Sequence, residues 1–150
     1  MTTLVDTNLL TRMVQPVHVQ HQDALDALTA LRLRGEALHL VPQNFYEFWV
    51  VATRPEAQNG LGMSAAEAEA DFATFRRLFT VLDDTPAIPP EWEQLVSRLG
   101  VVGKTAHDAR LVASMRVHGL NRLLTFNVGD FRRYPGITVL SPSDVLSAAP

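Results

Sequence analysis

The chain begins with MTTLVDTNLL (residues 1–10), in which a short apolar run leads to Asp6 and then to a helical pattern. Thr2–Asp6 has the length and composition of a β-strand, and Thr7 opens the helix. A carboxylate at such a junction has two interpretations. It is a turn or helix-capping aspartate, or it is the first ligand of a metal site at the carboxyl end of a strand.

Short apolar runs alternate with helical patterns through the rest of the chain. The expected strands are Thr2–Asp6, Leu38–Val41, Thr80–Leu82, Arg122–Thr125 and Thr138–Leu140. Five helices are expected after the one that Thr7 opens: Val19–Arg34, Gln43–Thr53, the segment from the Ser64 capping box to Phe79, Pro89 or Pro90 to Gly100, and a segment from its cap Thr105 to His118. This alternation predicts an α/β fold with parallel strands and helices on both faces. The 150 residues contain no repeat and no linker, so we expect one domain over 1–150.

The composition excludes several classes of protein. The sequence is 47% hydrophobic and 19% charged, as in ordinary globular proteins, and it contains no cysteine for disulfides or thiolate metal sites. The first residues lack the basic and apolar segments of a secretory signal. No apolar run approaches the ~20 residues of a membrane-spanning helix. We therefore expect a cytoplasmic protein that does not enter the membrane.

The formal charge of −3 is unevenly distributed. Residues 1–100 carry a net charge of −6, and residues 101–150 carry +3. Twelve of the thirteen cationic side chains are arginine, which is well shaped for bidentate contacts to phosphate. A compositional bias of the genome explains the same excess, so the charge pattern alone does not assign a partner.

Glu47 is the only charged side chain between Ala37 and Thr53. Phe45 and Phe48 lie beside it in an otherwise apolar helix. A carboxylate in such surroundings is costly unless a cation or a metal compensates it. The alternatives are an exposed glutamate or an ion pair with an arginine.

Two further segments place acidic side chains near strand ends. Asp108 lies in the first turn of its helix, where the helix dipole favours a negative charge, and it shares a face with the apolar residues that must pack on the sheet. Thr125, Asn127 and Asp130 follow the strand that begins at Arg122. Each segment has an ordinary interpretation as well: a helix-start aspartate, and a turn rich in turn-forming residues.

Taken together, the acidic residues form a stronger pattern. Asp6, Glu47, Asp108 and Asp130 come from four separate elements, each at or beside a strand end. An all-oxygen cluster suits a hard cation, Mg²⁺ or Mn²⁺. His39 and His107 are not spaced as a zinc pair.

These motifs resemble the PIN domain, in particular the VapC-type toxins of prokaryotic toxin–antitoxin pairs. The matching segments occur in order along nearly the whole chain: LVDTNLL (4–10), NFYEF (44–48), HDARLVAS (107–114) and LLTFNVGDF (123–131). Each segment is short, and the specificity lies in the four together. The resemblance implies a PIN-like three-layer fold, with a five-stranded, mostly parallel sheet flanked by helices.

The resemblance also implies an active site. It assigns Asp6, Glu47, Asp108 and Asp130 to the family's acidic quartet, which holds Mg²⁺ or Mn²⁺. Thr7, Asn8, Thr125 and Asn127 are the supporting residues. The fourth metal-ligating position could be filled by Asp130, by Asn127 or by both, and the sequence does not choose among them. It does not give the number of metal ions either.

The implied activity is that of an endoribonuclease. Metal-activated water would hydrolyse an RNA phosphodiester bond, leaving a 5′-phosphate and a 3′-hydroxyl. The family points to tRNA or rRNA as substrate. The candidates for steering the RNA backbone are Arg110, Arg116, Arg132 and Arg133, which are otherwise ordinary surface charges.

Two protein partners are expected. The first is a second copy of the chain, because Phe72, Phe75, Phe79 and Trp92 offer apolar surface and the family points to dimers. The second is a VapB-type antitoxin that brings a cation to the acidic pocket. The side chains that would form a groove for it, or else belong to the core, are Phe45, Phe48, Trp49, Leu25 and Leu28.

Other classes compete with this interpretation. One is a PIN-fold binding module without chemistry, and another is a PIN nuclease of RNA processing without an antitoxin. A phosphoacceptor signalling domain would need paired acids at the first strand and a late lysine, whereas the only lysine is Lys104. A haloacid-dehalogenase-type phosphatase would need an aspartate where Asn8 stands.

Overall fold

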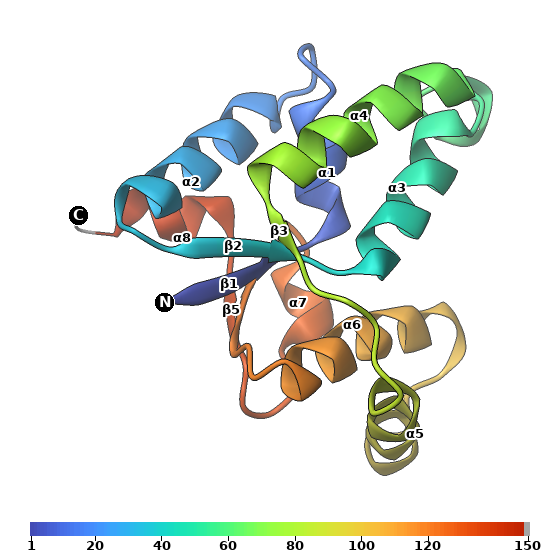
Figure 1. Ribbon diagram of the computed structural model, residues 1–150, viewed down its shortest axis with the longest axis vertical. Coiled ribbons are helices and arrows are strands. Elements are labelled where there is room, and N and C mark those ends of the chain that lie inside the picture. Colours follow the sequence, from blue (N-terminus) through green and yellow to red (C-terminus); the bar gives the residue numbers. More distant parts are fainter. Residues whose placement is uncertain (149–150) are drawn as a thin grey trace.

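The computed structural model describes residues 1–148 and contains one five-stranded sheet with helices on both faces (Figure 1). The strands are β1 (Thr2–Val5), β2 (Ala37–Leu40), β3 (Thr80–Val81), β4 (Arg122–Leu124) and β5 (Thr138–Leu140). The helices are α1 (Thr7–Met13), α2 (His21–Leu33), α3 (Pro42–Thr53), α4 (Ala65–Leu78), α5 (Ile88–Leu99), α6 (Ala106–Val117), α7 (Val128–Phe131) and α8 (Pro142–Ser147), with 3₁₀ turns η1 (Glu56–Gln58) and η2 (Gly103–Thr105).

The strand order is β3-β2-β1-β4-β5, and every pairing is parallel. Helices α1–α4 and α8 lie on one face of the sheet, and α5–α7 lie on the other (Figure 1). This arrangement confirms the predicted three-layer α/β fold. Because β1 is central, the residue that follows it lies in the middle of the strand ends, where open parallel sheets place their sites.

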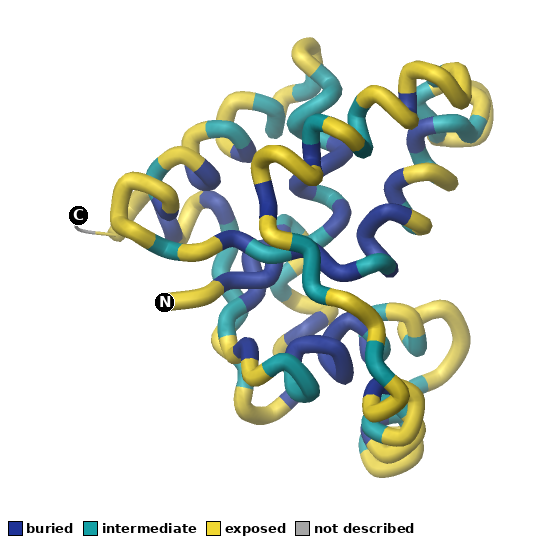
Figure 2. Tube along the Cα trace, in the orientation of Figure 1, coloured by how far each residue is buried: buried dark blue, intermediate teal, exposed yellow. Residues whose placement is uncertain are grey.

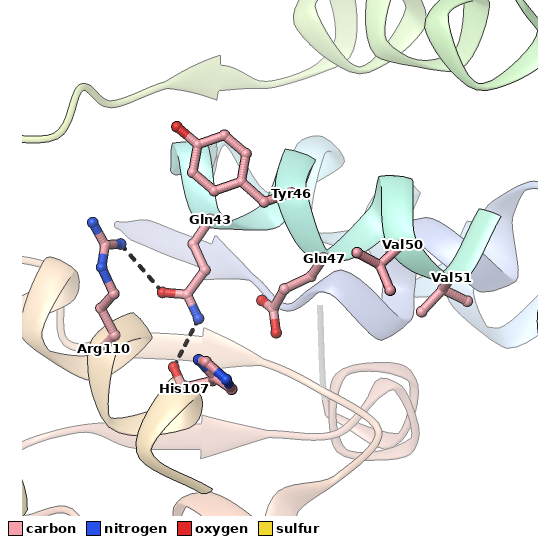
Figure 3. A pocket seen from close by; sticks show the side chains of 7 residues that line it. All are labelled: Gln43, Tyr46, Glu47, Val50, Val51, His107 and Arg110. Atoms are coloured by element: carbon pink, nitrogen blue, oxygen red, sulfur yellow. Dashed lines mark hydrogen bonds between the residues drawn. The ribbon is translucent and has the colours of Figure 1, made fainter. Parts of the chain in front are cut away.

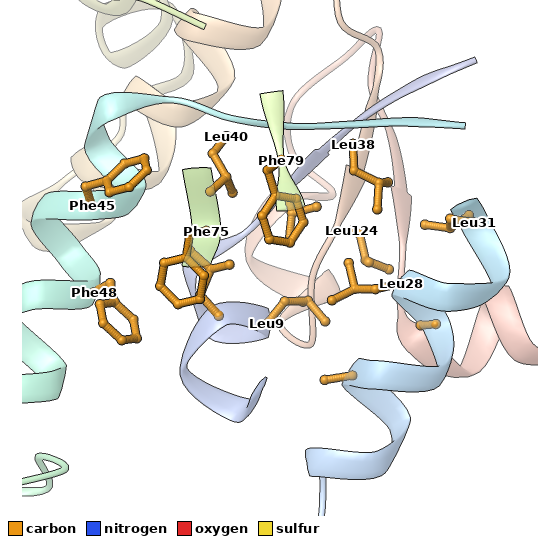
Figure 4. Packing of buried hydrophobic residues seen from close by; sticks show 14 of the residues in the cluster. Leu9, Leu28, Leu31, Leu38, Leu40, Phe45, Phe48, Phe75, Phe79 and Leu124 are labelled. Atoms are coloured by element: carbon orange, nitrogen blue, oxygen red, sulfur yellow. The ribbon is translucent and has the colours of Figure 1, made fainter. Parts of the chain in front are cut away.

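Two hydrophobic cores cover the two faces of the sheet, and the alternation of side chains along each strand explains them. Val5 and Leu124 belong to the core beneath α1–α4, whereas Leu4 and Leu123 belong to the core beneath α5 and α6. Figure 4 shows the first core, in which leucines of α1 and α2 meet phenylalanines of α3 and α4. The central strands are buried, and the outward turns of α2, α4 and α5 are exposed (Figure 2).

The predicted element boundaries agree with the structure to within about two residues. Thr105 is the N-cap residue of α6 as predicted, but its side chain makes no capping hydrogen bond, and its hydroxyl donates to the Val102 carbonyl at 2.6 Å. The short helices α7 and α8 were not predicted, because helices of four and six residues offer too few positions for a periodic pattern. Within residues 1–148, no helix is long and apolar enough to cross a membrane.

Candidate active site

A pocket of about 340 Å³ lies where β1 ends, and three of the four predicted acidic residues line it. Asp6 comes from the β1–α1 junction, Glu47 from the second turn of α3 and Asp108 from the first turn of α6. Three segments far apart in the sequence thus bring carboxylates to one place. The supporting residues Thr7, Asn8 and Asn127 also line the pocket.

Asp6 has the capping role that the sequence allowed, whereas its role as a metal ligand stays a prediction. It is the N-cap of α1, and its Oδ1 accepts a hydrogen bond from the Thr7 backbone N–H at 2.7 Å. Its Oδ2 accepts from the Thr125 hydroxyl at 2.7 Å and from the Asn8 side chain at 3.3 Å. Asn8 also donates to Thr125 at 3.1 Å. These bonds fix the orientation of the carboxylate and leave it in the pocket.

Glu47 is linked to Asp6 through Thr7, whose hydroxyl donates to Glu47 Oε1 at 3.2 Å while its backbone N–H donates to Asp6. The fully buried Asn44 donates to the same hydroxyl at 3.1 Å and to the Val5 carbonyl at 3.0 Å. Asn44 was missed from the sequence. The signal that could have found it is an amide three residues before Glu47 in an otherwise apolar helix.

Gln43 connects α3 to α6 through His107 and Arg110, the residues next to and near Asp108 in the sequence (Figure 3). Its side-chain amide donates to the His107 carbonyl at 2.7 Å, and its oxygen accepts from Arg110 at 3.3 Å. Figure 3 shows Glu47 pointing into the space between α3 and α6. Gln43 is a second residue that sequence reasoning missed.

Burial and mutual repulsion raise the pKa values of the three carboxyl groups. The pKa of Glu47 is raised to about 7, mainly by burial and then by Asp6 and Asp108. The pKa of Asp108 is raised to about 6 by burial, Asp6 and Asp130. Burial also raises the pKa of Asp6, although hydrogen bonds from Thr125 and Thr7 oppose the shift. The cluster therefore lacks a compensating positive charge.

Two residues are candidates for the fourth metal-ligating position, and both lie near the site. Asn127 lines the pocket, and its backbone N–H donates to the Thr125 hydroxyl at 3.0 Å. Asp130 is exposed on α7, close enough for its charge to raise the pKa of Asp6 and Asp108. The structure thus leaves both residues near the site, with Asn127 in the wall and Asp130 outside it.

The donor set fits a hard divalent cation. The three carboxylates in the pocket offer oxygen ligands, and within residues 1–148 none of the ion pairs involves the acidic quartet. No three acidic or histidine side chains in the described residues are close enough to chelate an ion by themselves. Mg²⁺ commonly binds through one or two carboxylates and keeps several waters, so this spacing is compatible with it.

The aromatic side chains on which two surface predictions depended are mostly internal. Phe45, Phe48 and Leu28 are buried in the core, which is the alternative that the sequence left open, whereas Leu25 is half-buried and the exposed apolar side chains of α3 are Tyr46, Trp49 and Val50. The aromatic surface expected for a dimer is also internal: Phe75 and Phe79 are buried, and Phe72 and Trp92 pack against the cores. Aromatic spacing alone did not distinguish core from surface. The dimer itself stays a prediction.

The arginines expected to steer RNA are mostly engaged elsewhere. Arg110 pairs with Asp84 and Arg116 with Glu91, both at 3.3 Å. Arg133 donates to the Leu99 carbonyl at 2.6 Å. These contacts hold loops and helices, so the expectation that they form a free cationic surface is weakened for all but Arg132.

Several solved structures share this fold. A chain of the VapBC2 complex of Rickettsia felis, bound to a DNA fragment from its promoter, matches with a TM-score of 0.70 and 13% identity over 94% of this chain and 98% of that chain. VapBC-1 of nontypeable Haemophilus influenzae matches with a TM-score of 0.67 and 14% identity, covering 95% and 99%. VapC20 of Mycobacterium tuberculosis, a sarcin-ricin loop cleaving toxin, matches with a TM-score of 0.59 and 18% identity, covering 81% and 86%.

No protein-family model and no curated protein sequence matches the chain. The fold is nevertheless clear, because these structures align over most of both chains. The chain has the PIN-domain fold of VapC-type toxins, as its sequence motifs predicted.

Proposed function

We propose that the protein is a Mg²⁺-dependent endoribonuclease and the toxin of a toxin–antitoxin pair. The observation that carries this proposal is the pocket in which Asp6, Glu47 and Asp108 are half-buried without a cationic partner among residues 1–148. Carboxylates in this arrangement destabilise the protein unless they bind a cation. The shared fold with a sarcin-ricin loop cleaving toxin supports RNA as the substrate class.

In this mechanism the residues of the chain have separate tasks. Asp6 and Asp108 would hold Mg²⁺. Glu47, together with Asn127, Asp130 or both, would complete the coordination directly or through water. When bound, Mg²⁺ supplies positive charge to the scissile phosphate and lowers the pKa of water. Thr7, Asn8 and Thr125 keep the Asp6 and Glu47 carboxylates oriented through the hydrogen bonds described above.

Glu47 would act as a metal ligand. Without metal its pKa is raised to about 7, and a bound Mg²⁺ would lower that pKa and keep the carboxylate charged at neutral pH. Hydrolysis would leave a 5′-phosphate and a 3′-hydroxyl, and tRNA or rRNA would be the target.

The proposed partner is an antitoxin of the VapB type. Several structures with the same fold are VapBC complexes. The surface that fits a partner segment is a pocket of about 510 Å³ between α3 and α6, with apolar walls from Tyr46, Val50 and Val51 and with Glu47 at its edge (Figure 3). An arginine of the partner would relieve the repulsion among the carboxylates, because its planar fork meets two carboxylate oxygens.

The activity is tested by incubating the purified protein with total cellular RNA, with Mg²⁺ and with EDTA. We expect cleavage only with Mg²⁺, and products whose 5′ ends are phosphorylated. Cleavage that persists in EDTA would contradict metal dependence. Binding of RNA without any cleavage in Mg²⁺ or Mn²⁺ would favour a silent binding module.

The partner is tested by co-purification with the product of a neighbouring small gene. We expect a stable complex with little ribonuclease activity, and recovery of activity when one arginine or lysine in the partner's C-terminal segment is replaced by alanine. If the complex keeps full ribonuclease activity, or if no stable complex forms, a PIN nuclease of RNA processing becomes the better interpretation.

A further inference from the structure

Two arginines that the sequence did not single out line the same pocket as the carboxylates. Arg12 lies near the end of α1, and Arg54 follows the last residue of α3. Both contribute to the wall of the 340 Å³ pocket that contains Asp6, Glu47 and Asp108. The lining of the pocket therefore contains two cations as well as three carboxylates.

Arg12 is fixed by neutral groups. Its Nε donates to Gln20 Oε1 at 2.9 Å, and its Nη1 donates to Gln15 Oε1 at 2.7 Å. Within residues 1–148, no carboxylate oxygen lies within ion-pair distance of it. Burial lowers the pKa of Arg12, and no carboxylate counteracts that shift. The amides thus hold the guanidinium in place without neutralising its charge.

Arg54 is held mainly through its backbone. Its carbonyl accepts from the Gly62 N–H at 2.9 Å, and a Cβ at Gly60 would overlap that carbonyl, so the loop needs glycine there. Its Nη2 donates to the Asn59 carbonyl at 3.3 Å. Its Nε is buried and has no hydrogen-bond partner among the described residues. An unsatisfied donor on a charged group is costly and calls for an acceptor.

Three other arginines of the described residues differ from these two. Arg110, Arg116 and Arg122 each pair with a carboxylate. Arg12 and Arg54 lie beside several carboxylates in one pocket and pair with none of them. Neutralisation of the acidic cluster is therefore not their role, and the carboxylates remain available to a metal ion.

We propose that Arg12 and Arg54 form a phosphate-binding subsite that binds a backbone phosphate of RNA next to the scissile bond. The inference rests on the proposed nuclease function and names residues for substrate binding within the same site. A planar guanidinium with free N–H donors suits a phosphate oxygen pair. The subsite would offset the repulsion that the carboxylates exert on an incoming RNA strand.

The test compares Arg12→Gln, Arg54→Gln and the double variant with the wild type and with Arg77→Gln. Arg77 is exposed on α4, and its side chain makes one hydrogen bond among the described residues, to Thr74. The loss of its charge therefore controls for overall charge. The probe is a fluorescent single-stranded RNA of randomised sequence, about 12 nucleotides long, because phosphate contacts do not depend on sequence. Binding is measured with Ca²⁺ replacing Mg²⁺, between about 50 and 200 mM KCl.

Each single variant should weaken binding about 5- to 20-fold and reduce the slope of log affinity against log salt by about 0.7. In Mg²⁺, the KM for RNA should rise while kcat changes little, as for a contact that is equally strong in the ground and transition states. Arg12→Lys should retain the slope, because it keeps the charge but loses the contacts to both glutamines. A purely structural role predicts that the lysine and glutamine variants fail together.

The subsite proposal is overturned if the double variant has the same RNA affinity and the same slope of log affinity against log salt as Arg77→Gln. The same result for Arg12→Lys and Arg12→Gln, accompanied by a lower melting temperature, would also overturn it. The nuclease proposal fails separately. A wild-type protein that binds RNA through Arg12 and Arg54 but never cleaves it would keep the subsite and remove the enzyme.

Discussion

The two ends of the sheet treat carboxylates in opposite ways. At the amino ends of the strands, Glu36 is only 8% exposed and pairs with Arg122 at 3.0 Å, and it also accepts from the Thr3 hydroxyl at 2.7 Å. At the carboxyl ends, Asp6, Glu47 and Asp108 share a pocket and have no cationic partner in the described residues. One end is electrostatically satisfied, and the other is not.

This difference separates stability from function. A buried carboxylate with its cation connects β1, β4 and the residue before β2, and removing either member leaves an uncompensated charge. Carboxylates kept together without a cation weaken the fold and are retained where they bind something. Substitutions at the two ends should therefore have opposite consequences.

The largest effect should come from substitutions at the carboxyl ends of the strands, where the carboxylates have no cationic partner among the described residues. We expect Asp108→Asn or Asp6→Asn to reduce RNA cleavage by at least about a thousandfold while the protein stays folded, because each change removes charge that would hold the metal. The measurement is kcat/KM in Mg²⁺ together with the circular dichroism spectrum. Wild-type cleavage by either variant would show that these carboxylates are not the metal site.

The next effect should appear at the paired end. We expect Glu36→Gln to lower the free energy of unfolding by about 2–4 kcal/mol, because Arg122 loses its counter-charge in a mostly buried position. Urea unfolding measures this change. Activity at temperatures well below the melting transition should stay near the wild-type value; a selective loss of activity without a loss of stability would break the comparison.

A smaller effect with the opposite sign should be seen for Glu47→Gln in metal-free protein. The pKa of Glu47 is raised from 4.5 to about 7 in the folded protein, so the folded state binds this proton more tightly than the unfolded chain does. The resulting contribution to stability is complete below about pH 4.5 and is lost as the pH rises through about 7.

We therefore expect Glu47→Gln to be more stable than the wild type by about 1–2 kcal/mol near pH 8, after a discount for solvent screening. The advantage should vanish near pH 4.5. Urea unfolding in EDTA across this range tests it, and added Mg²⁺ should stabilise the wild type more than the variant. Equal stabilities at both pH values would mean that Glu47 is adequately solvated.

The smallest effect should come from Thr125→Val, which removes the hydroxyl that donates to Asp6 at 2.7 Å. Loss of one orienting hydrogen bond to a charged group should reduce kcat/KM about tenfold without abolishing activity. Thr125→Ser keeps the hydroxyl and should recover most of the rate. If valine keeps the rate and serine loses it, the Thr125 methyl group rather than its hydroxyl matters.

Much of this molecule could be predicted from local patterns. The strand that ends at Asp6 and the capping box at Ser64 are both present in the structure, because apolar spacing and capping chemistry act over a few residues. Aromatic spacing was less informative, because it left open whether Phe45 and Phe48 belong to a groove or to the core, and both are buried. The periodicity of apolar residues identifies the apolar face of a helix. It does not show which other element packs against that face.

The sequence by itself determined the order of the elements, the parallel sheet and the identity of the acidic residues. Only the tertiary structure decided that Asp6, Glu47 and Asp108 share a pocket without a counter-ion, while Glu36 receives Arg122. It also brought Arg12 and Arg54 to that pocket. The physical reason is that charge interactions depend on distance and burial, and both arise when segments tens of residues apart pack on one sheet.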